Sequence, residues 1–358
     1  YVSTAASTTA SLNCGQRPFS YTAPAGYKAI CTSNLPTPTI KKSSQFMNVV
    51  TYTGTGATRS LTGVGFIPDL VWTKSRSNIE THKLTDSVRG TSKALSSETT
   101  GDEVSESGVT SFDSDGFTIG STTTGYNTNT YTYVGWSWKK GTTPGFDIVT
   151  YTGNGVTNAQ FGHGLGVTPS MTIIKNRSSA VEHWNVWHTS LGAQTYYLFL
   201  ETSDVTYTIS NGRIQSLTST MVTIGNNSEL NTSGSLYVAY CWAAIPGYSA
   251  FGSYTGNGSA DGPFVYTGFR PKFLLYKRTD SAQTWQIQDA TRQTYNPVNL
   301  GAYPALATVE ATDVNGGFDF TSNGFKVRCN ASAAVNYSGG TYVYAAFAEI
   351  PFKYARAR

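Results

Sequence analysis

The sequence predicts an all-β protein of three tandem antiparallel β-sandwich units, jelly-roll or concanavalin-like in character, after a short N-terminal linker segment. One observation is a segment that recurs with Gly, Pro, Lys and Arg in the same order: GFIPDLVWTKSR from Gly65, GVTPSMTIIKNR from Gly166 and GFRPKFLLYKR from Gly268. Its period of about 100 residues indicates repeated structural units. The other observation is composition: 13% of residues are aromatic, only 13% are charged, and glycine is abundant. This mixture favours short strands joined by turns.

Each unit also begins and ends alike. The opening segments are VVTYTGTG from Val49, IVTYTGNG from Ile148 and FGSYTGNG from Phe251, and the closing segments are YVGWSWKKG from Tyr133, YVAYCWAAIPG from Tyr237 and YVYAAFAEIPF from Tyr342. We therefore divide the chain into 46–143 (unit 1), 144–246 (unit 2) and 247–358 (unit 3), and we interpret 1–45 as the end of a preceding domain plus a linker. The short links between units predict a fairly stiff rod.

Alternation in the closing strands indicates the sheet type, because residues two apart share a face. In unit 1, Val134, Trp136 and Trp138 form one apolar face, while Gly135 and Ser137 on the other are smaller or more polar. This predicts half-buried strands in antiparallel sheets, with two stacked sheets in each unit.

Charge, hydropathy and cysteine spacing argue against several function classes. The net charge of +4 comes from scattered lysines and arginines, so no nucleic-acid partner is expected. No apolar run approaches the roughly 18 residues that span a bilayer, so no membrane insertion is expected. The four cysteines (Cys14, Cys31, Cys241 and Cys329) lack metal-ligand spacing, and no metal or other cofactor is predicted.

The histidines do not indicate a catalytic triad. The chain has four (His82, His163, His183 and His188), and no GxSxG motif accompanies them. In the repeat alignment His188 replaces Asp86 and Asp289, a drift not expected of a catalytic base. We predict that the protein is not an enzyme.

Acidic residues gather in unit 1, where a pair of carboxylates is one requirement of glycan hydrolysis. The group comprises Asp86, Glu98, Asp102 and Glu103. We interpret it as a polar surface loop rather than a catalytic pair.

A basic pair follows the same strand in every unit: Lys74 and Arg76, Lys175 and Arg177, Lys277 and Arg278. One interpretation is a site for anions or acidic glycans, with Lys175 and Arg177 as its candidate residues. The other is a structural pair with a nearby acid such as Asp86 or Asp289. We favour the structural interpretation because the pair repeats with the fold.

Aromatic residues provide the remaining candidates for ligand binding. Trp184, Trp187 and Trp285 follow the basic pairs, and His188 is close to them in the sequence. A solvent-facing indole can stack on a sugar while a neighbouring polar group binds its hydroxyls. We therefore include these four residues, with Lys175 and Arg177, as candidate glycan contacts.

Several segments together resemble a group of tailed-bacteriophage virion proteins. They are NCGQRPFSYTAPAGYKAICTSNLPTPTI from Asn13, then VVTYTG, GFIPDLVWTKSRS, HKLTDSVRG, SFDSDGF and the terminal PFKYARAR. In that group a SPRY-like domain precedes repeated β-rich modules, so the resemblance implies that residues 1–45 end such a domain. It also implies an exposed position on the virion and a homotrimer, and it supplies no catalytic residues.

These expectations lead to a fibre protein that binds a host-surface glycan or protein without catalysis, through many weak contacts. The alternative is a purely structural capsid fibre or decoration protein that binds other virion proteins. A third function class is a polysaccharide-degrading tailspike.

Overall fold

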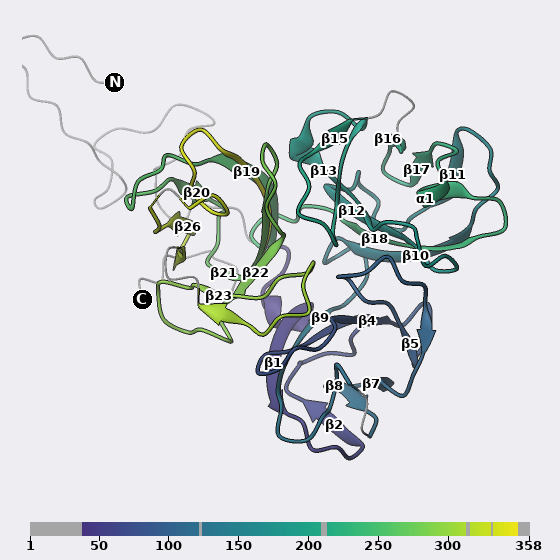
Figure 1. Cartoon of the computed structure of the whole chain (residues 1–358), viewed down its shortest axis with the longest axis horizontal. Coiled ribbons are helices and arrows are strands. Elements are labelled where there is room, and N and C mark those ends of the chain that lie inside the picture. The colour runs from purple at the N-terminus through teal and green to yellow at the C-terminus, as the bar shows by residue number, and fades with distance from the viewer. Residues whose placement is uncertain (1–37, 122–123, 209–212, 313–315, 331, 350–358) are drawn as a thin grey trace, which may run out of the picture.

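The computed structural model describes residues 38–121, 124–208, 213–312, 316–330 and 332–349 (Figure 1). Strands dominate these ranges, and every strand pair in the sheets is antiparallel. The prediction of an all-β antiparallel protein is confirmed. The SPRY-like segment predicted within 1–45 lies almost entirely outside the described residues.

Unit 1 contains a large sheet and a small sheet. The large sheet has the order β1 (Met47–Thr53), β9 (Thr132–Trp138), β3 (Leu70–Ser75), β4 (Lys83–Asp86). The small sheet has the order β2 (Arg59–Thr62), β8 (Gly116–Ile119), β7 (Val109–Asp113). A two-stranded sheet, β5 (Lys93–Ala94) and β6 (Val104–Ser105), and the 3-10 helix η2 (Ser43–Gln45) complete the described elements.

Unit 2 has the same strand order, with its large sheet extended at one edge. That sheet runs β10 (Phe146–Thr152), β18 (Leu236–Trp242), β12 (Met171–Asn176), β13 (Asn185–His188), β14 (Tyr196–Phe199), β15 (Tyr207–Thr208). The small sheet runs β11 (Ala159–Gly162), β17 (Met221–Ile224), β16 (Ile214–Leu217). The short helices are η3 (Thr189–Leu191) and α1 (Ser228–Asn231).

Unit 3 follows the order of unit 1. Its large sheet runs β19 (Ser249–Thr255), β27 (Thr341–Ala348), β21 (Pro271–Arg278), β22 (Gln286–Asp289). Its small sheet runs β20 (Phe264–Tyr266), β26 (Gly324–Val327), β25 (Phe318–Thr321), and β23 (Leu300–Gly301) pairs with β24 (Ala311–Thr312). In the described part of the chain, each sheet takes all its strands from a single unit.

Glycine is required at the tight turn between two strands of the small sheet. Gly116 follows the tight turn between β7 and β8, and a Cβ atom there would lie 1.9 Å from the Leu61 carbonyl oxygen on β2. Gly324 occupies the same place in unit 3, 2.0 Å from the Val265 carbonyl oxygen. A side chain at either position would push the edge strand away.

Each large sheet buries both faces. One face packs on the small sheet of its own unit: Tyr133 and Val71 pack with Phe117 in unit 1. The opposite face contributes to a core shared by all three units, which includes Trp136 of unit 1. The predicted half-burial of β9 is therefore wrong, since Ser137 is fully buried too.

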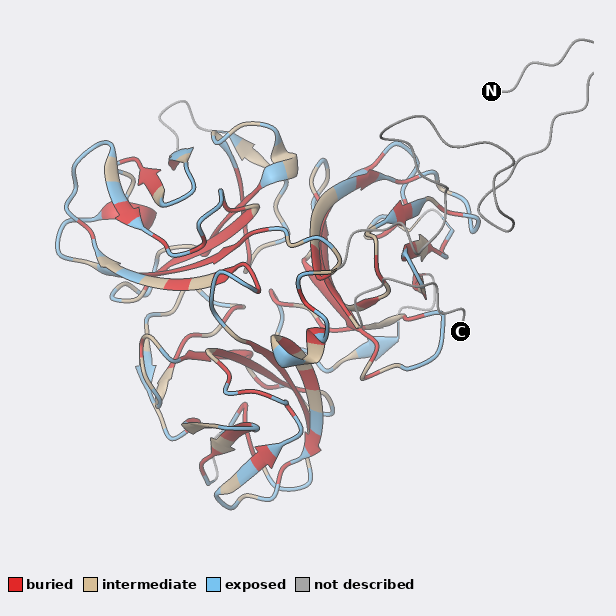
Figure 2. Cartoon of the chain, turned by 180° about the vertical axis from the view of Figure 1, so that it is seen from behind, coloured by how far each residue is buried: buried red, intermediate tan, exposed pale blue. Residues whose placement is uncertain are grey.

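The shared core arranges the units around a common centre. Trp138, Trp242 and Phe347, which lie at equivalent positions near the ends of the closing strands of the three units, all belong to this one cluster. Figure 1 shows three lobes around this centre, and Figure 2 shows the buried strands converging on it. The predicted rod is wrong, because the apolar outer faces of the sheets bury each other instead of facing water.

Candidate functional site

Two of the predicted glycan-binding tryptophans hold neighbouring units together. Trp184 Nε1 donates hydrogen bonds to the carbonyl oxygens of Ser96 at 3.1 Å and Thr99 at 3.0 Å, both in unit 1. Trp285 Nε1 donates to the carbonyl oxygen of Phe199 in unit 2 at 2.8 Å. The residues are 0% and 1% exposed, so neither has the solvent-facing indole that sugar stacking requires.

Trp187 and His188 are also buried. Trp187 is 7% exposed and packs in the core of unit 2. His188 Nδ1 accepts a hydrogen bond from the Ser190 amide, so Nε2 carries the proton and donates to the Tyr344 carbonyl oxygen in unit 3 at 3.0 Å. Burial lowers the pKa of His188 to about 4.

The lysine of each basic pair donates to backbone carbonyl oxygens, and Lys175 has such a partner for each of its three N–H groups. Lys175 Nζ donates to the carbonyl oxygens of Thr100 in unit 1 and of Asn176 and Glu182 in unit 2, at 2.8–2.9 Å. Desolvation lowers the pKa of this lysine to about 8. Lys74 likewise donates to Ala307 of unit 3. A lysine whose donors are used in this way is not available to an acidic glycan.

The arginines pair with acids, as the structural interpretation predicts, but with acids other than those proposed. Arg177 of unit 2 binds Glu103 of unit 1 through two hydrogen bonds of 2.9 Å. Arg76 of unit 1 pairs with Glu310 of unit 3 at 2.8 Å. Arg278 differs because it lies one position earlier in the register, and it pairs with Asp280 of its own unit.

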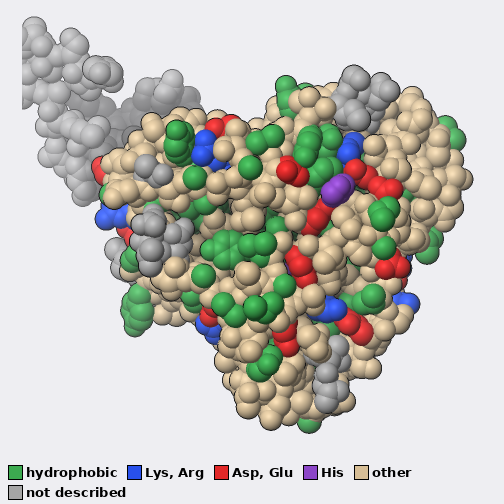
Figure 3. Space-filling view, viewed as in Figure 1, with side chains coloured by type: hydrophobic (Ala, Val, Ile, Leu, Met, Phe, Trp, Pro, Cys, Tyr) green, Lys and Arg blue, Asp and Glu red, His purple; other side chains and the backbone are tan. Residues whose placement is uncertain are grey.

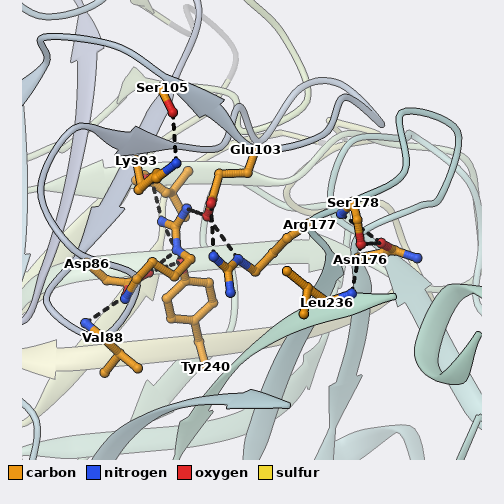
Figure 4. Close-up of polar contacts among 12 residues, drawn as sticks. Asp86, Val88, Lys93, Glu103, Ser105, Asn176, Arg177, Ser178, Leu236 and Tyr240 are labelled. Atoms are coloured by element: carbon orange, nitrogen blue, oxygen red, sulfur yellow. Dashed lines mark hydrogen bonds and ion pairs between the residues drawn. The ribbon is translucent and has the colours of Figure 1, made fainter. Parts of the chain in front are cut away.

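Asp86 belongs to a buried cluster between units 1 and 2 (Figure 4). Its carboxylate pairs with Arg89 and accepts a hydrogen bond from Tyr240 Oη of unit 2 at 2.8 Å. Glu103 joins Arg89 to Arg177 of unit 2. The prediction of a polar surface loop is wrong for Asp86, which is fully buried because unit 2 covers it.

Units 3 and 1 meet through an equivalent cluster. Asp289 pairs with Arg292 and accepts a hydrogen bond from Trp136 Nε1 of unit 1 at 3.0 Å. Glu310 then joins Arg292 to Arg76 of unit 1. Each acid–arginine pair therefore bonds to an aromatic donor on the closing strand of the next unit.

Units 2 and 3 meet differently, and two linked substitutions explain why. The closing strand of unit 3 has Ala345 where units 1 and 2 have Trp136 and Tyr240. A carboxylate opposite alanine would lose its aromatic donor, and unit 2 instead has His188, which donates to the backbone of Tyr344.

A surface patch of unit 2 is the candidate functional site, and we call it the unit-2 patch. His183 pairs through Nδ1 with Glu201, and its ring stacks on Phe199 with the ring centroids 4.1 Å apart. The His183 side chain is 37% exposed, whereas that of Glu201 is 4% exposed. Burial raises the pKa of Glu201. On the face shown in Figure 3, a histidine lies beside acidic side chains.

Aromatic rings form the floor of the unit-2 patch. Tyr197 stacks on Tyr207 with centroids 5.4 Å apart, and the Arg213 guanidinium lies 4.0 Å from the Tyr197 ring centroid. Arg213 is held by an ion pair with Glu229. Tyr197, Phe199 and Arg213 are buried, so the patch presents to water the partly exposed His183 imidazole and Tyr207 ring above a packed aromatic floor. An imidazole and a ring face are groups that bind sugars.

Four residues of the unit-2 patch do not repeat, whereas Glu201 has a counterpart in Glu98 of unit 1, which accepts the His82 amide as Glu201 accepts the Trp184 amide. The strand registers place smaller residues at the positions of these four in units 1 and 3: Ala94 and Gly301 for Tyr197, Val104 and Ala311 for Tyr207, Gly108 and Gly317 for Arg213, Thr81 and Thr284 for His183. The fold is built twice without these side chains, so the fold does not require them.

The sequence contains a signal for this patch in the differences between the repeats. The segment YYLF from Tyr196 aligns with KALS from Lys93 and LGAY from Leu300. Its aromatic residues have few counterparts in the other units. A search for what differs between the repeats would have found it.

In the described ranges, no three histidine, cysteine or acidic residues cluster closely enough to hold a metal ion. None of the described helices has the length and apolarity to cross a membrane.

A family model described as Domain of unknown function (DUF7483) matches residues 42–351, so the chain belongs to that family. A comparison with curated proteins finds no match.

Proposed function

We propose that this member of the DUF7483 family is an adhesion protein of a bacteriophage virion, which binds a host-surface glycan or protein without catalysing a reaction. The observation that carries the proposal is the unit-2 patch, because its His183 and Tyr207 are partly exposed and units 1 and 3 fold with smaller residues at both positions. The buried contacts between units support it by holding the patch on a rigid body. The virion itself is proposed from the sequence resemblance.

Cell binding by the isolated protein tests this proposal. We expect fluorescently labelled protein to bind susceptible bacteria saturably, with competition from the cells' extracted polysaccharide. Replacing His183 and Tyr207 by alanine removes an imidazole and a partly exposed ring, and we expect the affinity to fall about tenfold. The matched control is Thr81→Ala with Val104→Ala, the equivalent positions of unit 1, which should leave the affinity unchanged. Equal binding by both double variants would refute the role of the patch.

The structural alternative also has a supporting observation. Ile79 and Val181 are 76% and 74% exposed, and they lie in the same loop of units 1 and 2. Exposed apolar side chains at regular positions suit packing on a repeating protein surface. If the labelled protein sediments with virions that lack it and does not bind cells, this alternative replaces adhesion. Release of reducing sugar in the same assays would favour the tailspike class instead.

We further propose that the three units are tandem repeats of one jelly-roll or concanavalin-like sandwich. The support is the strand order of the large and small sheets, which is the same three times apart from the extended edge in unit 2.

The homotrimer implied by the resemblance is part of the proposal, because three copies of the unit-2 patch would bind one cell with avidity. We expect light scattering at micromolar concentration to give three times the chain mass of 38.5 kDa. A mass of one chain would remove the trimer and leave single-site binding.

A further inference from the structure

A second non-repeating surface lies on unit 3, far along the chain from the unit-2 patch. Phe264 and Tyr266 are 47% and 65% exposed on β20, the edge strand of the small sheet. Val265 between them is buried in the core of unit 3. Since alternate residues of a strand share a face, both rings lie on the outer face of this sheet. We call Phe264 and Tyr266 the aromatic platform.

Glycines allow the rings of the platform to lie on the backbone. A Cβ atom at Gly324, on the neighbouring strand β26, would lie 3.1 Å from Phe264 Cζ. A Cβ atom at Gly268 would lie 3.5 Å from Tyr266 Oη. Each ring therefore extends over a position without a side chain, and its outer side remains open to water. Rings held in this way on a sheet are preorganised for stacking.

The fold does not require aromatic residues at these two positions. The equivalent outward residues are Ser60 and Thr62 on β2 in unit 1, and Gln160 and Gly162 on β11 in unit 2. Exposing two large rings to water gains nothing from burial. A ligand that covers them would explain why unit 3 has them.

The charges around the platform cancel. Lys326 lies opposite Phe264 in the strand register and pairs with Asp261 at 2.6 Å. Arg328 pairs with Asp319 at 3.0 Å. Two positive and two negative side chains, already paired, leave no net attraction for an anion or a cation. They retain exposed oxygen and nitrogen atoms that can bond hydroxyl groups, because the Asp261 side chain is 82% exposed.

We propose that the aromatic platform binds an uncharged polysaccharide, with one sugar ring stacked on each aromatic ring. Two residues along a strand are about 7 Å apart, so neighbouring or alternate sugars of one chain can reach both rings. The ion-paired residues of the rim bond to hydroxyls. This second site goes beyond the proposed function, and its binding does not require the unit-2 patch.

Affinity electrophoresis tests this inference. The full chain is run in native gels that contain a neutral β-glucan, a neutral galactomannan, dextran or anionic alginate. We expect at least one neutral polymer to retard the protein and alginate to have little effect. Phe264→Ala with Tyr266→Ala should weaken the binding at least about tenfold. The matched control, Ser60→Ala with Thr62→Ala, should be retarded like the wild type.

A conservative variant separates stacking from hydrogen bonding: Phe264→Tyr with Tyr266→Phe keeps both rings and should keep the retardation. The inference is overturned if none of the neutral polymers retards the wild type, if alginate retards it most, or if the alanine variant is retarded equally. It is also overturned if light scattering shows a dimer that the alanine variant loses, since a second copy would then cover the platform. The cell-binding assay with the His183 variant is independent of all these outcomes.

Discussion

Replacing Arg89 by alanine is expected to lower the free energy of unfolding by about 3–5 kcal/mol, the usual effect of breaking a buried ion pair. The Arg89 and Asp86 side chains are both fully buried. Without the guanidinium, the Asp86 carboxylate would remain in the interior with Tyr240 as its hydrogen-bond donor from unit 2. Glu103 would also lose one of the two arginines that it joins. The loss therefore affects unit 1 and its contact with unit 2 together.

Urea denaturation followed by tryptophan fluorescence measures this effect. Arg328→Ala is the matched control, because Arg328 is 45% exposed and its pair with Asp319 lies at the surface of one unit. Exposed ion pairs contribute roughly 0–1 kcal/mol. If the two variants lost the same stability, the cluster would not hold units 1 and 2 together as we infer. Arg292→Ala should behave like Arg89→Ala, because the Asp289 cluster has the same geometry.

Acid is expected to destabilise the protein through His188. Its pKa is about 4 in the fold, because burial disfavours the charged ring, and about 6.5 in an unfolded chain. Above pH 6.5 the His188 ring is neutral in both the folded and the unfolded state, so it does not lower the free energy of unfolding. Between pH 6.5 and 4 the unfolded chain binds a proton that the fold does not, so the free energy of unfolding falls. The total loss from this residue is about 3 kcal/mol below pH 4.

The variant His188→Gln isolates this contribution. A glutamine amide can donate to the Tyr344 carbonyl oxygen but does not titrate, so the variant should lose less stability than the wild type between pH 6.5 and 4. Denaturation curves at several pH values measure the difference. Identical slopes for His188→Gln and the wild type would contradict the assignment. Burial also lowers the pKa of His82, which should add to the acid effect.

The sequence predicts the strands well because each signal is local. The pattern of the closing segment from Tyr133 depends on neighbouring residues, and the segment forms β9 where the pattern indicates. The relation between units depends on contacts such as Trp136 with Asp289, which are far apart in the chain. The periodicity of apolar residues does not report contacts between distant residues. The sequence therefore does not distinguish units arranged in a rod from units arranged around a common centre.

The candidate site was harder to predict for a related reason. Tryptophan suits both a sugar-binding surface and a core, and Trp184 and Trp285 lie in the core because their N–H groups find carbonyl partners in another unit. The partner of His183 is Glu201, 18 residues further along the chain, and its counterpart in unit 1, Glu98, has no histidine partner because Thr81 takes the place of His183. A comparison among the repeats is more informative than residue type, because it separates what the fold needs from what one unit adds.

The contact between units 3 and 1 has a consequence for the order in which the chain folds during synthesis. Lys74 bonds to Ala307 and Arg76 to Glu310, partners 233 and 234 residues further along the chain. The ribosome releases unit 1 before these partners exist, so its side of the shared core, including Trp136, lacks its unit-3 contacts until unit 3 has been translated. The contact between units 3 and 1 is then the last to form. Its partners are far apart in the chain, and contacts of such long separation cost the most loop-closure entropy. Until unit 3 emerges, the nascent chain exposes apolar surface of unit 1 to chaperones and to other nascent chains.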